Sequence, residues 1–284
     1  MSAWLVGSGV CIRDRSAAIY VLDGLLPGTA QPLIAACAVP VLSSVAELKA
    51  WRDATRNGTS APPAALHVDT GLHRLGMGAD DVAALARDPT LMRGQKLALV
   101  MSHLACADDP AHPMNRQQLD LFKTMTDGLG LKRSLSATGG VLLGPDYHFD
   151  ITRPGIGLYG GEPFSEANPV VHLSLPVIQI RDLTPGETVG YGNSWTAQVP
   201  SRIATVAAGY ADGLIRAMSN KGMLWADKTP CPIAGRVSMD MIGVDITLLD
   251  HDPEALDILS PYQTIDDLAD LAGTTGYEIL KLHN

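Results

Sequence analysis

The stretch LALVMSHLACADDPAHPMNRQQLDLFKTMTDGLG, residues 97–130, joins one expected strand to one expected helix. Residues 97–101 are continuously apolar, which is typical of a strand buried on both faces, and polar residues follow from Ser102 onward. Residues 115–130 place apolar side chains at helical spacing and end in a Gly-containing stop. Such strand–helix units recur through the first half of the chain. Their alternation predicts a parallel sheet covered by helices.

The remaining units extend this pattern on both sides. Further strands are expected within 18–28, 38–42, 62–77, 133–140 and 147–161, and helices within 44–58 and 80–91. This gives about six strands where a closed (β/α)8 barrel has about eight. We therefore expect an incomplete (β/α)8 TIM barrel over residues 1–165, with its start truncated. Short β-rich runs separated by Pro/Gly turns predict a mostly antiparallel β domain over residues 166–284.

Composition restricts the class of protein. The 284 residues carry a net charge of −9 and are 46% hydrophobic, as expected of a soluble globular chain. The acidic balance and the lack of a basic run argue against nucleic-acid binding, and no apolar run reaches the roughly 18 residues of a membrane span. The start of the chain is not a convincing signal peptide. The four cysteines are widely spaced, which indicates a reducing, cytoplasmic setting and no metal site.

Several polar residues follow the expected strands of the first half. Arg74 lies on the loop of HVDTGLHRLGM (67–77), where its planar guanidinium suits a carboxylate; a surface ion pair is the alternative. His103 ends a strand and is either a packing residue or a site residue. Thr138 precedes Gly139 and Gly140, and this small-residue cluster is either a turn or a place where backbone N–H groups meet a phosphate.

Further candidates lie in Gly-rich segments. In RPGIGLYGG (153–161), Arg153 precedes a proline, and the amides of Gly155 and Ile156 are open to an anion. Arg153 faces either a ring nitrogen or an internal carboxylate, with a structural salt bridge as the alternative. Tyr210 precedes Ala-Asp-Gly and either reaches a phosphate or packs in the β domain.

Two more segments hold candidates in the second half. Met239 and Asp240 are expected in a turn, where a backbone N–H can support a substrate carboxylate. Tyr191 lies between two glycines and is either a turn residue or a phenol held out into a site.

Taken in order, these segments resemble one family, the pyridoxal phosphate (PLP)-dependent alanine racemases. The resemblance runs through HVDTGLHRLGM (67–77), SHLACAD (102–108), HFDITRPGIGLYG (148–160), VGYGNSWTA (189–197), GYADG (209–213) and GRVSMDM (235–241). It implies a (β/α)8 barrel followed by a β domain, PLP as cofactor, alanine as substrate, and a homodimer with active sites shared between subunits.

The resemblance also implies roles. Tyr191 is similar to the catalytic tyrosine, which acts in the partner's site as one of two bases; a lysine that binds PLP covalently is the other. Arg153 is similar to the arginine that donates to the pyridine nitrogen. His103 is similar to the residue that contacts the ring in a Tyr–His–Arg network. We expect His103 and Arg153 to provide the cationic neighbours that a phenol needs to act as a base.

Other roles concern phosphate and substrate. Arg74 and the Met239 backbone N–H resemble the substrate-carboxylate contacts, and Asp240 resembles an acidic residue at the entrance. The residues that resemble the phosphate site are Thr138, Gly155, Ile156 and Tyr210.

The chain departs from the family pattern in four places. No stretch like A-x-V-K-A-x-A-Y-G-H-G, which carries the family's PLP lysine, occurs here, and we expect an N-terminal piece to be missing. His67 stands where many members have a lysine, and Ala137 stands where many have an asparagine. The C-terminal GYEILKLHN stops short of the family's tyrosine-containing end.

Three functions remain open from the sequence. The first is an alanine racemase that supplies D-alanine for peptidoglycan or serves alanine catabolism. The second is a catalytically impaired remnant or binding protein of the same lineage. The third is a racemase for another amino acid such as serine, since Arg74 fixes a carboxylate but not a side-chain size.

Overall fold

The computed structural model describes residues 17–56 and 61–282. The segment 1–16, which we do not expect to be a signal peptide, lies outside the described residues. The chain divides into two compact units at Pro154–Gly155, and each has its own core.

The first unit is built on a five-stranded sheet in the order β1-β2-β3-β4-β5. All its strand pairs are parallel, as the strand–helix alternation predicts. The strands are β1 (Tyr20–Val21), β2 (Val39–Leu42), β3 (Ala64–His67), β4 (Leu97–Met101) and β5 (Lys132–Ser134). The helices are α2 (Ala30–Ala35), α3 (Val45–Thr55), α4 (Ala79–Arg87), α5 (Pro113–Thr126) and the short α6 (Thr138–Leu142).

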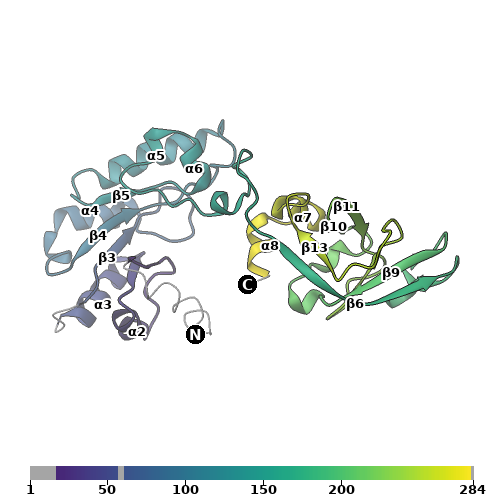
Figure 1. The fold of residues 1–284 in the computed structure, drawn as a ribbon. Helices are drawn as coiled ribbons and strands as arrows, with labels where there is room; N and C mark the ends of the chain where they lie inside the picture. Colours follow the sequence, from purple (N-terminus) through teal and green to yellow (C-terminus); the bar gives the residue numbers. More distant parts are fainter. Residues whose placement is uncertain (1–16, 57–60, 283–284) are drawn as a thin grey trace. The chain divides into compact units, whose positions relative to one another are not determined.

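Alternate strand residues face opposite sides of this sheet. Leu42, Leu66 and Val100 pack with apolar side chains of the helices into one core. Figure 1 shows the strands and helices of this unit. The residues on the other face form a separate cluster: Val39, Val41, Ala65, Leu99 and Met101. Because side chains alternate along a strand, His67 continues the face of Ala65, and His103 continues the face of Met101. This is the inner face of an incomplete barrel.

The strand expected within 147–161 does not form. The chain there is joined to the sheet strand β5 and its following loop by single bonds, from the Asp150 and Ile151 amides to the Arg133 carbonyl and from the Arg153 amide to the Ser136 carbonyl. Pro154 has no N–H to continue a ladder. The sequence therefore overstates the strand count of this unit by one.

The second unit is a six-stranded antiparallel sheet, as predicted, in the order β11-β10-β13-β6-β9-β12. Its long central strand is β6 (Leu173–Leu183), which pairs with β9 (Ser201–Val206) and β13 (Ala255–Leu259); the outer strands are β10 (Met223–Ala226), β11 (Thr229–Pro232) and β12 (Ile242–Asp245). A small separate ribbon pairs β7 (Thr188–Val189) with β8 (Trp195–Thr196). Helices α7 (Ile265–Ala272) and α8 (Gly276–Leu282) close the chain (Figure 1).

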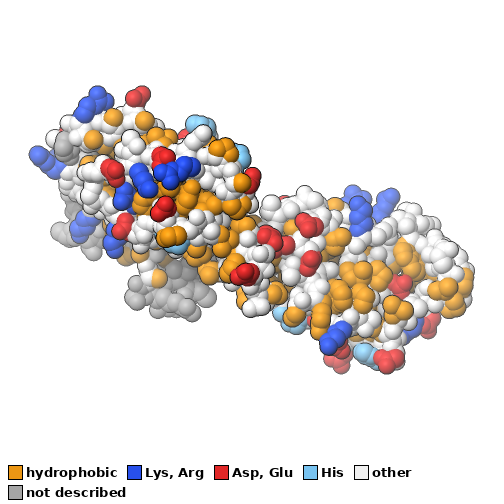
Figure 2. Space-filling view, turned by 90° about the horizontal axis from the view of Figure 1, so that it is seen from above, with side chains coloured by type: hydrophobic (Ala, Val, Ile, Leu, Met, Phe, Trp, Pro, Cys, Tyr) orange, Lys and Arg blue, Asp and Glu red, His pale blue; other side chains and the backbone are white. Residues whose placement is uncertain are grey.

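The surface mixes charges. On the face shown in Figure 2, basic side chains are interspersed with acidic and apolar ones. None of the described helices is both long and apolar enough to cross a membrane.

Candidate active site

Arg153 lies among the loops that follow β4 and β5. Its Nη2 donates to the Ser102 carbonyl at 2.7 Å and to the Leu135 carbonyl at 3.3 Å, and its Nη1 donates to the Ser134 hydroxyl. Nη2 also lies 3.4 Å from Nδ1 of His103. Burial lowers the pKa of Arg153 to about 10, so the guanidinium remains a cation at neutral pH. These contacts fix a cationic donor at the carboxyl ends of the strands, where barrels place their sites.

His103 is a neutral imidazole. Burial, followed by the charges of Arg153 and Arg74, lowers its pKa to about 4. A guanidinium can only donate, so the contact with Arg153 requires Nδ1 of His103 to be unprotonated. The expectation that His103 provides a cationic neighbour for the catalytic phenol is therefore wrong, and only Arg153 keeps its charge.

His67 is a second buried imidazole on the same face of the sheet. Burial and the charges of Arg153 and Arg74 lower its pKa, while Asp69 acts in the opposite direction. Its Nδ1 is buried and has no hydrogen-bond partner within the described residues. Two neutral imidazoles and two arginines thus share the carboxyl ends of β3, β4 and β5, which favours an anionic ligand.

The loop after β3 carries Arg74. The Asp69 carboxylate accepts from the Gly71 and His73 amides and pairs with the His73 ring, which closes a tight turn. Gly76 has φ +121°, and a Cβ there would lie 2.6 Å from the Asp69 amide nitrogen. Within the described residues Arg74 makes no hydrogen bond or ion pair, and it is exposed. The turn therefore presents an uncommitted guanidinium.

Thr138 begins α6, four residues after β5 ends. The two glycines that follow allow close packing of this helix. A Cβ on Gly139 would lie 2.9 Å from the Ala107 Cβ, and one on Gly140 would lie 2.7 Å from the Ser136 hydroxyl. The Thr-Gly-Gly cluster is thus a packed helix start.

In the second unit, the Gly155–Ile156 segment meets Tyr277 of α8. The Ile156 amide donates to the Tyr277 hydroxyl at 2.7 Å, and a Cβ on Gly155 would lie 1.9 Å from that oxygen. Sequence reasoning missed Tyr277, because it treated the C-terminal segment as lacking the family's tyrosine. The signal was the Gly-Tyr-Glu at the start of the last helix, 276–278.

Tyr210 and Met239 are brought together by two loops. The Tyr210 amide donates to the Ser238 carbonyl at 2.9 Å, and the Ala211 amide donates to the Met239 carbonyl at 3.0 Å. Gly209 makes this approach possible, since a Cβ there would lie 2.1 Å from the Met239 carbonyl oxygen. Asp240 follows on the surface.

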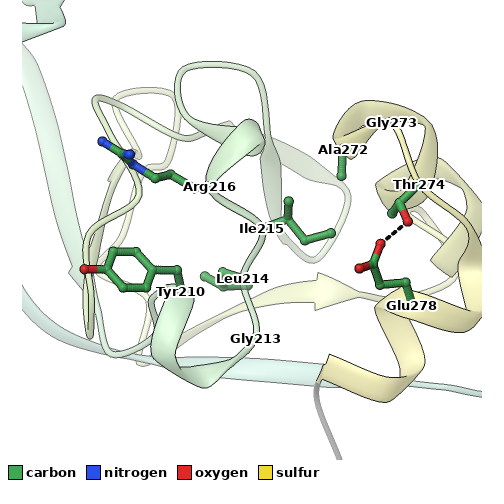
Figure 3. A pocket seen from close by; sticks show the side chains of 9 residues that line it. All are labelled: Tyr210, Gly213, Leu214, Ile215, Arg216, Ala272, Gly273, Thr274 and Glu278. Carbon is green, nitrogen blue, oxygen red and sulfur yellow. Dashed lines mark hydrogen bonds between the residues drawn. The ribbon is translucent and has the colours of Figure 1, made fainter.

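A pocket of about 380 Å³ opens beside Tyr210. Figure 3 shows Tyr210 and Arg216 on one side of the pocket, and on the other the hydrogen-bonded pair Thr274, in the turn between α7 and α8, and Glu278 of α8. A basic residue, Arg216, and an acidic residue, Glu278, therefore both line this pocket of the second unit.

Tyr191 lies at the tip between β7 and β8, in a short 3₁₀ turn over Tyr191–Asn193. Its flanking residues Gly190 and Gly192 have φ +74° and +71°, which side-chain-bearing residues rarely adopt. Behind the turn, a Cβ on Gly192 would lie 3.2 Å from the Arg236 guanidinium carbon. The phenol is 73% exposed, so it contributes little to the core of its own unit.

Lysines lie elsewhere. Within residues 17–56 and 61–282, none lies at the carboxyl end of a strand of the parallel sheet: the lysines are Lys49, Lys96, Lys123, Lys132, Lys221, Lys228 and Lys281. Residues 17–56 and 61–282 also contain no group of three or more His, Cys, Asp or Glu side chains that could hold a metal ion.

Two family models match this chain in sequence order. Residues 8–163 match the alanine racemase N-terminal domain, and residues 170–283 match the alanine racemase C-terminal domain. The chain belongs to the alanine racemase family. An alanine racemase from Dinoroseobacter shibae is 55% identical over 277 residues, covering 96% of this chain and 77% of that protein. One from Cereibacter sphaeroides (strain ATCC 17029) is 57% identical over 85% of this chain and 67% of that protein.

Solved alanine racemases share the fold. The Bartonella henselae alanine racemase with covalently bound pyridoxal phosphate has a TM-score of 0.87 and 31% identity, covering 98% of this chain and 81% of that chain. The biosynthetic alanine racemase of Pseudomonas aeruginosa has a TM-score of 0.80 and 33% identity. These likenesses establish the incomplete barrel and the β domain as the alanine racemase architecture.

The residues of this chain fit the family's cofactor in their donor chemistry. Arg153 is a buried, fixed cation that can donate to a pyridine nitrogen, and the orphaned Nδ1 of His67 lies near it. A covalent attachment point is not among the described strand ends, so we assign the noncovalent contacts only.

Proposed function

We propose that this protein interconverts L- and D-alanine with PLP as cofactor. The observation that carries the proposal is Arg153, held by Ser102, Ser134 and His103 in a chain that matches both domains of the alanine racemase family. Within the described residues none of these partners is a carboxylate, which argues against a structural salt bridge as the role of Arg153.

Arg153 would set the electronic character of the bound cofactor. PLP supplies an electron sink that acidifies the Cα–H of an amino acid. Arg153, which remains a cation, would donate a hydrogen bond to the pyridine nitrogen and would not transfer its proton to it. This contact would make the bound cofactor a weaker electron sink, which would favour proton return over side reactions that need a long-lived carbanion.

The phosphate contacts would come from backbone and hydroxyl donors. Tyr277 belongs with this group, since its hydroxyl already holds the Ile156 amide. A phenol and an amide that share one hydrogen bond can turn together toward an incoming anion. The other residues that we propose for this role are Thr138, Gly155, Ile156 and Tyr210.

Substrate binding would rest on Arg74 and the Met239 amide. Among the described residues the guanidinium of Arg74 has no hydrogen-bond or ion-pair partner to give up when it binds a carboxylate. Asp240 is exposed beside Met239 and would line the entrance. Arg74 and the Met239 amide would both bind the substrate carboxylate, so they do not select the substrate side chain. The assay below therefore also tests serine as a substrate.

Tyr191 would take or return the α-proton at its phenolic oxygen. Its exposure at the tip of a ribbon supports a role in the site of a second copy, and we propose a homodimer with shared sites.

We further propose a cytoplasmic enzyme that supplies D-alanine for peptidoglycan. The described cysteines Cys37, Cys106 and Cys231 are free thiols, as a reducing compartment requires.

The test is production of D-alanine from L-alanine by the purified protein supplied with PLP. We expect turnover that falls by about 10²- to 10⁴-fold in Tyr191→Phe, the usual contribution of a positioned proton-transfer group. Borohydride reduction followed by peptide mapping then tests whether any lysine of this chain forms a covalent bond with PLP. Binding of PLP without turnover would indicate a catalytically impaired remnant or binding protein of the family. Faster turnover of serine than of alanine would indicate a serine racemase.

A further inference from the structure

A buried glutamine joins two loops of the first unit. Gln118 lies on α5 and is 0% exposed. Its Oε1 accepts from the Ala105 amide at 2.8 Å. Its Nε2 donates to the His103 carbonyl at 2.9 Å and to the Thr70 hydroxyl at 3.1 Å. Both amide hydrogens and the amide oxygen are therefore used, and each bond reaches a loop that follows a strand.

The bonds continue from Gln118 to Arg153. The Thr70 hydroxyl lies 2.8 Å from the Ser102 hydroxyl, and the Ser102 carbonyl accepts from Arg153 at 2.7 Å. Gln118, Thr70 and Ser102 are all buried. A continuous polar path thus connects helix α5, the loop after β3, the loop after β4 and the cation of the proposed site.

Close packing supports the same connection. Gly71 follows Thr70 at φ +128°, and a Cβ there would lie 2.5 Å from the Met114 Cε and 3.9 Å from the Gln118 Cγ. The loop that leads to Arg74 therefore rests directly on α5. If one member of a buried hydrogen-bond network is lost, its partners are left buried without a hydrogen bond, which costs free energy. A fully bonded network therefore stabilises one arrangement of its residues.

We propose that Gln118 is a positioning residue for the proposed site. It fixes the loops after β3 and β4 against α5, and so sets Arg74, His103 and Arg153 relative to one another. Gln118 contacts neither substrate nor cofactor. The catalytic part of this inference rests on the proposed racemase function; the positioning part does not.

The test compares Gln118→Met with Gln117→Met. The two glutamines are adjacent on α5, but Gln117 is exposed, so the second variant makes the same substitution without touching the network. NMR follows the ring nitrogens of His103 and the side-chain N–H signals of Arg153. We expect both to shift or broaden in Gln118→Met and to stay unchanged in Gln117→Met.

Kinetics provide the second readout. We expect kcat/KM for alanine to fall about tenfold in Gln118→Met, the size expected for loss of a buried hydrogen bond, and mostly through KM because Arg74 binds the ground-state carboxylate. Gln117→Met should change it by less than about twofold. Leu119→Ala, which opens the core beside Gln118 without removing a hydrogen bond, controls for lost stability.

Thr70→Val serves if Gln118→Met does not fold. It keeps the volume but removes the link between Gln118 and Ser102, and we expect the same NMR changes. Wild-type NMR signals in both variants would overturn the proposal. An equal rise in KM in Leu119→Ala at matched melting temperature would also overturn it. A wild-type protein without racemase activity would reject the proposed function, while the NMR comparison would still decide the role of Gln118.

Discussion

At the scale of single residues, His103 shows how burial decides protonation. The same cation that makes the site attractive to anions holds the imidazole neutral. Proximity to a proposed catalytic phenol is therefore not evidence that a histidine is charged. The neutral ring is a hydrogen-bond acceptor for Arg153, and its contribution to Tyr191 in a neighbouring subunit would be orientation.

The depressed pKa of His103 predicts a pH dependence of stability. In the unfolded chain the imidazole titrates near 6.5, and in the folded chain near 4. Between these values the unfolded state binds more protons, so stability falls as pH drops from about 6.5 toward 4. The contribution reaches about 3 kcal/mol at most.

The measurement is the free energy of unfolding in urea at pH 7, 5.5 and 4 for the wild type and His103→Gln. Glutamine fills similar space and does not titrate. We expect the free energy of unfolding of the wild type, relative to that of His103→Gln, to fall as pH drops. The lowered pKa of His67 makes the stability of both proteins fall with pH, so it cancels in this comparison. Parallel pH curves would contradict a neutral, buried His103.

At the scale of elements, the start of α8 packs against the turn at Gly155 and is joined to it by the hydrogen bond from the Ile156 amide to the Tyr277 hydroxyl. A methyl group on Gly155 would displace the Tyr277 phenol and release the Ile156 amide. We expect hydrogen exchange at the Ile156 amide to rise about fivefold in Gly155→Ala, as one net hydrogen bond is worth about 1 kcal/mol.

Gly78→Ala is the matched control for this prediction. Gly78 has nothing within 4 Å of an added Cβ and no positive φ. Tyr277→Phe should reproduce the faster exchange without crowding the turn. Unchanged protection of Ile156 in both Gly155→Ala and Tyr277→Phe would show that another group holds this amide.

The elements also show what the sequence could predict. Apolar runs such as 97–101 identified the parallel strands, because burial on both faces leaves few polar residues. The segment 147–161 carried the same kind of signal but forms no strand, since Pro154 cannot donate and the surrounding glycines favour turns. Arg153, His103 and Arg74 were found by motif order. Gln118 was not, because one glutamine on an amphipathic helix looks like any surface residue until its partners are known.

At the scale of the whole molecule, a shared active site needs two chains. The proposed residues fall in two groups: the strand-end residues of the first unit, and Tyr191 on a turn that is exposed in its own unit. Closed twofold symmetry would give two equivalent sites, each completed by the other chain. The family match covers both units and is consistent with this arrangement.

Subunit mixing tests this central claim most directly. Tyr191→Phe and Arg153→Met homodimers should each be nearly inactive, since each lacks one required group at both sites. After the two proteins are denatured and refolded together, random pairing makes about half of the dimers mixed, and each mixed dimer has one intact site. We predict recovery of about a quarter of wild-type D-alanine production. No recovery from a mixture that demonstrably contains mixed dimers would contradict an active site shared between subunits.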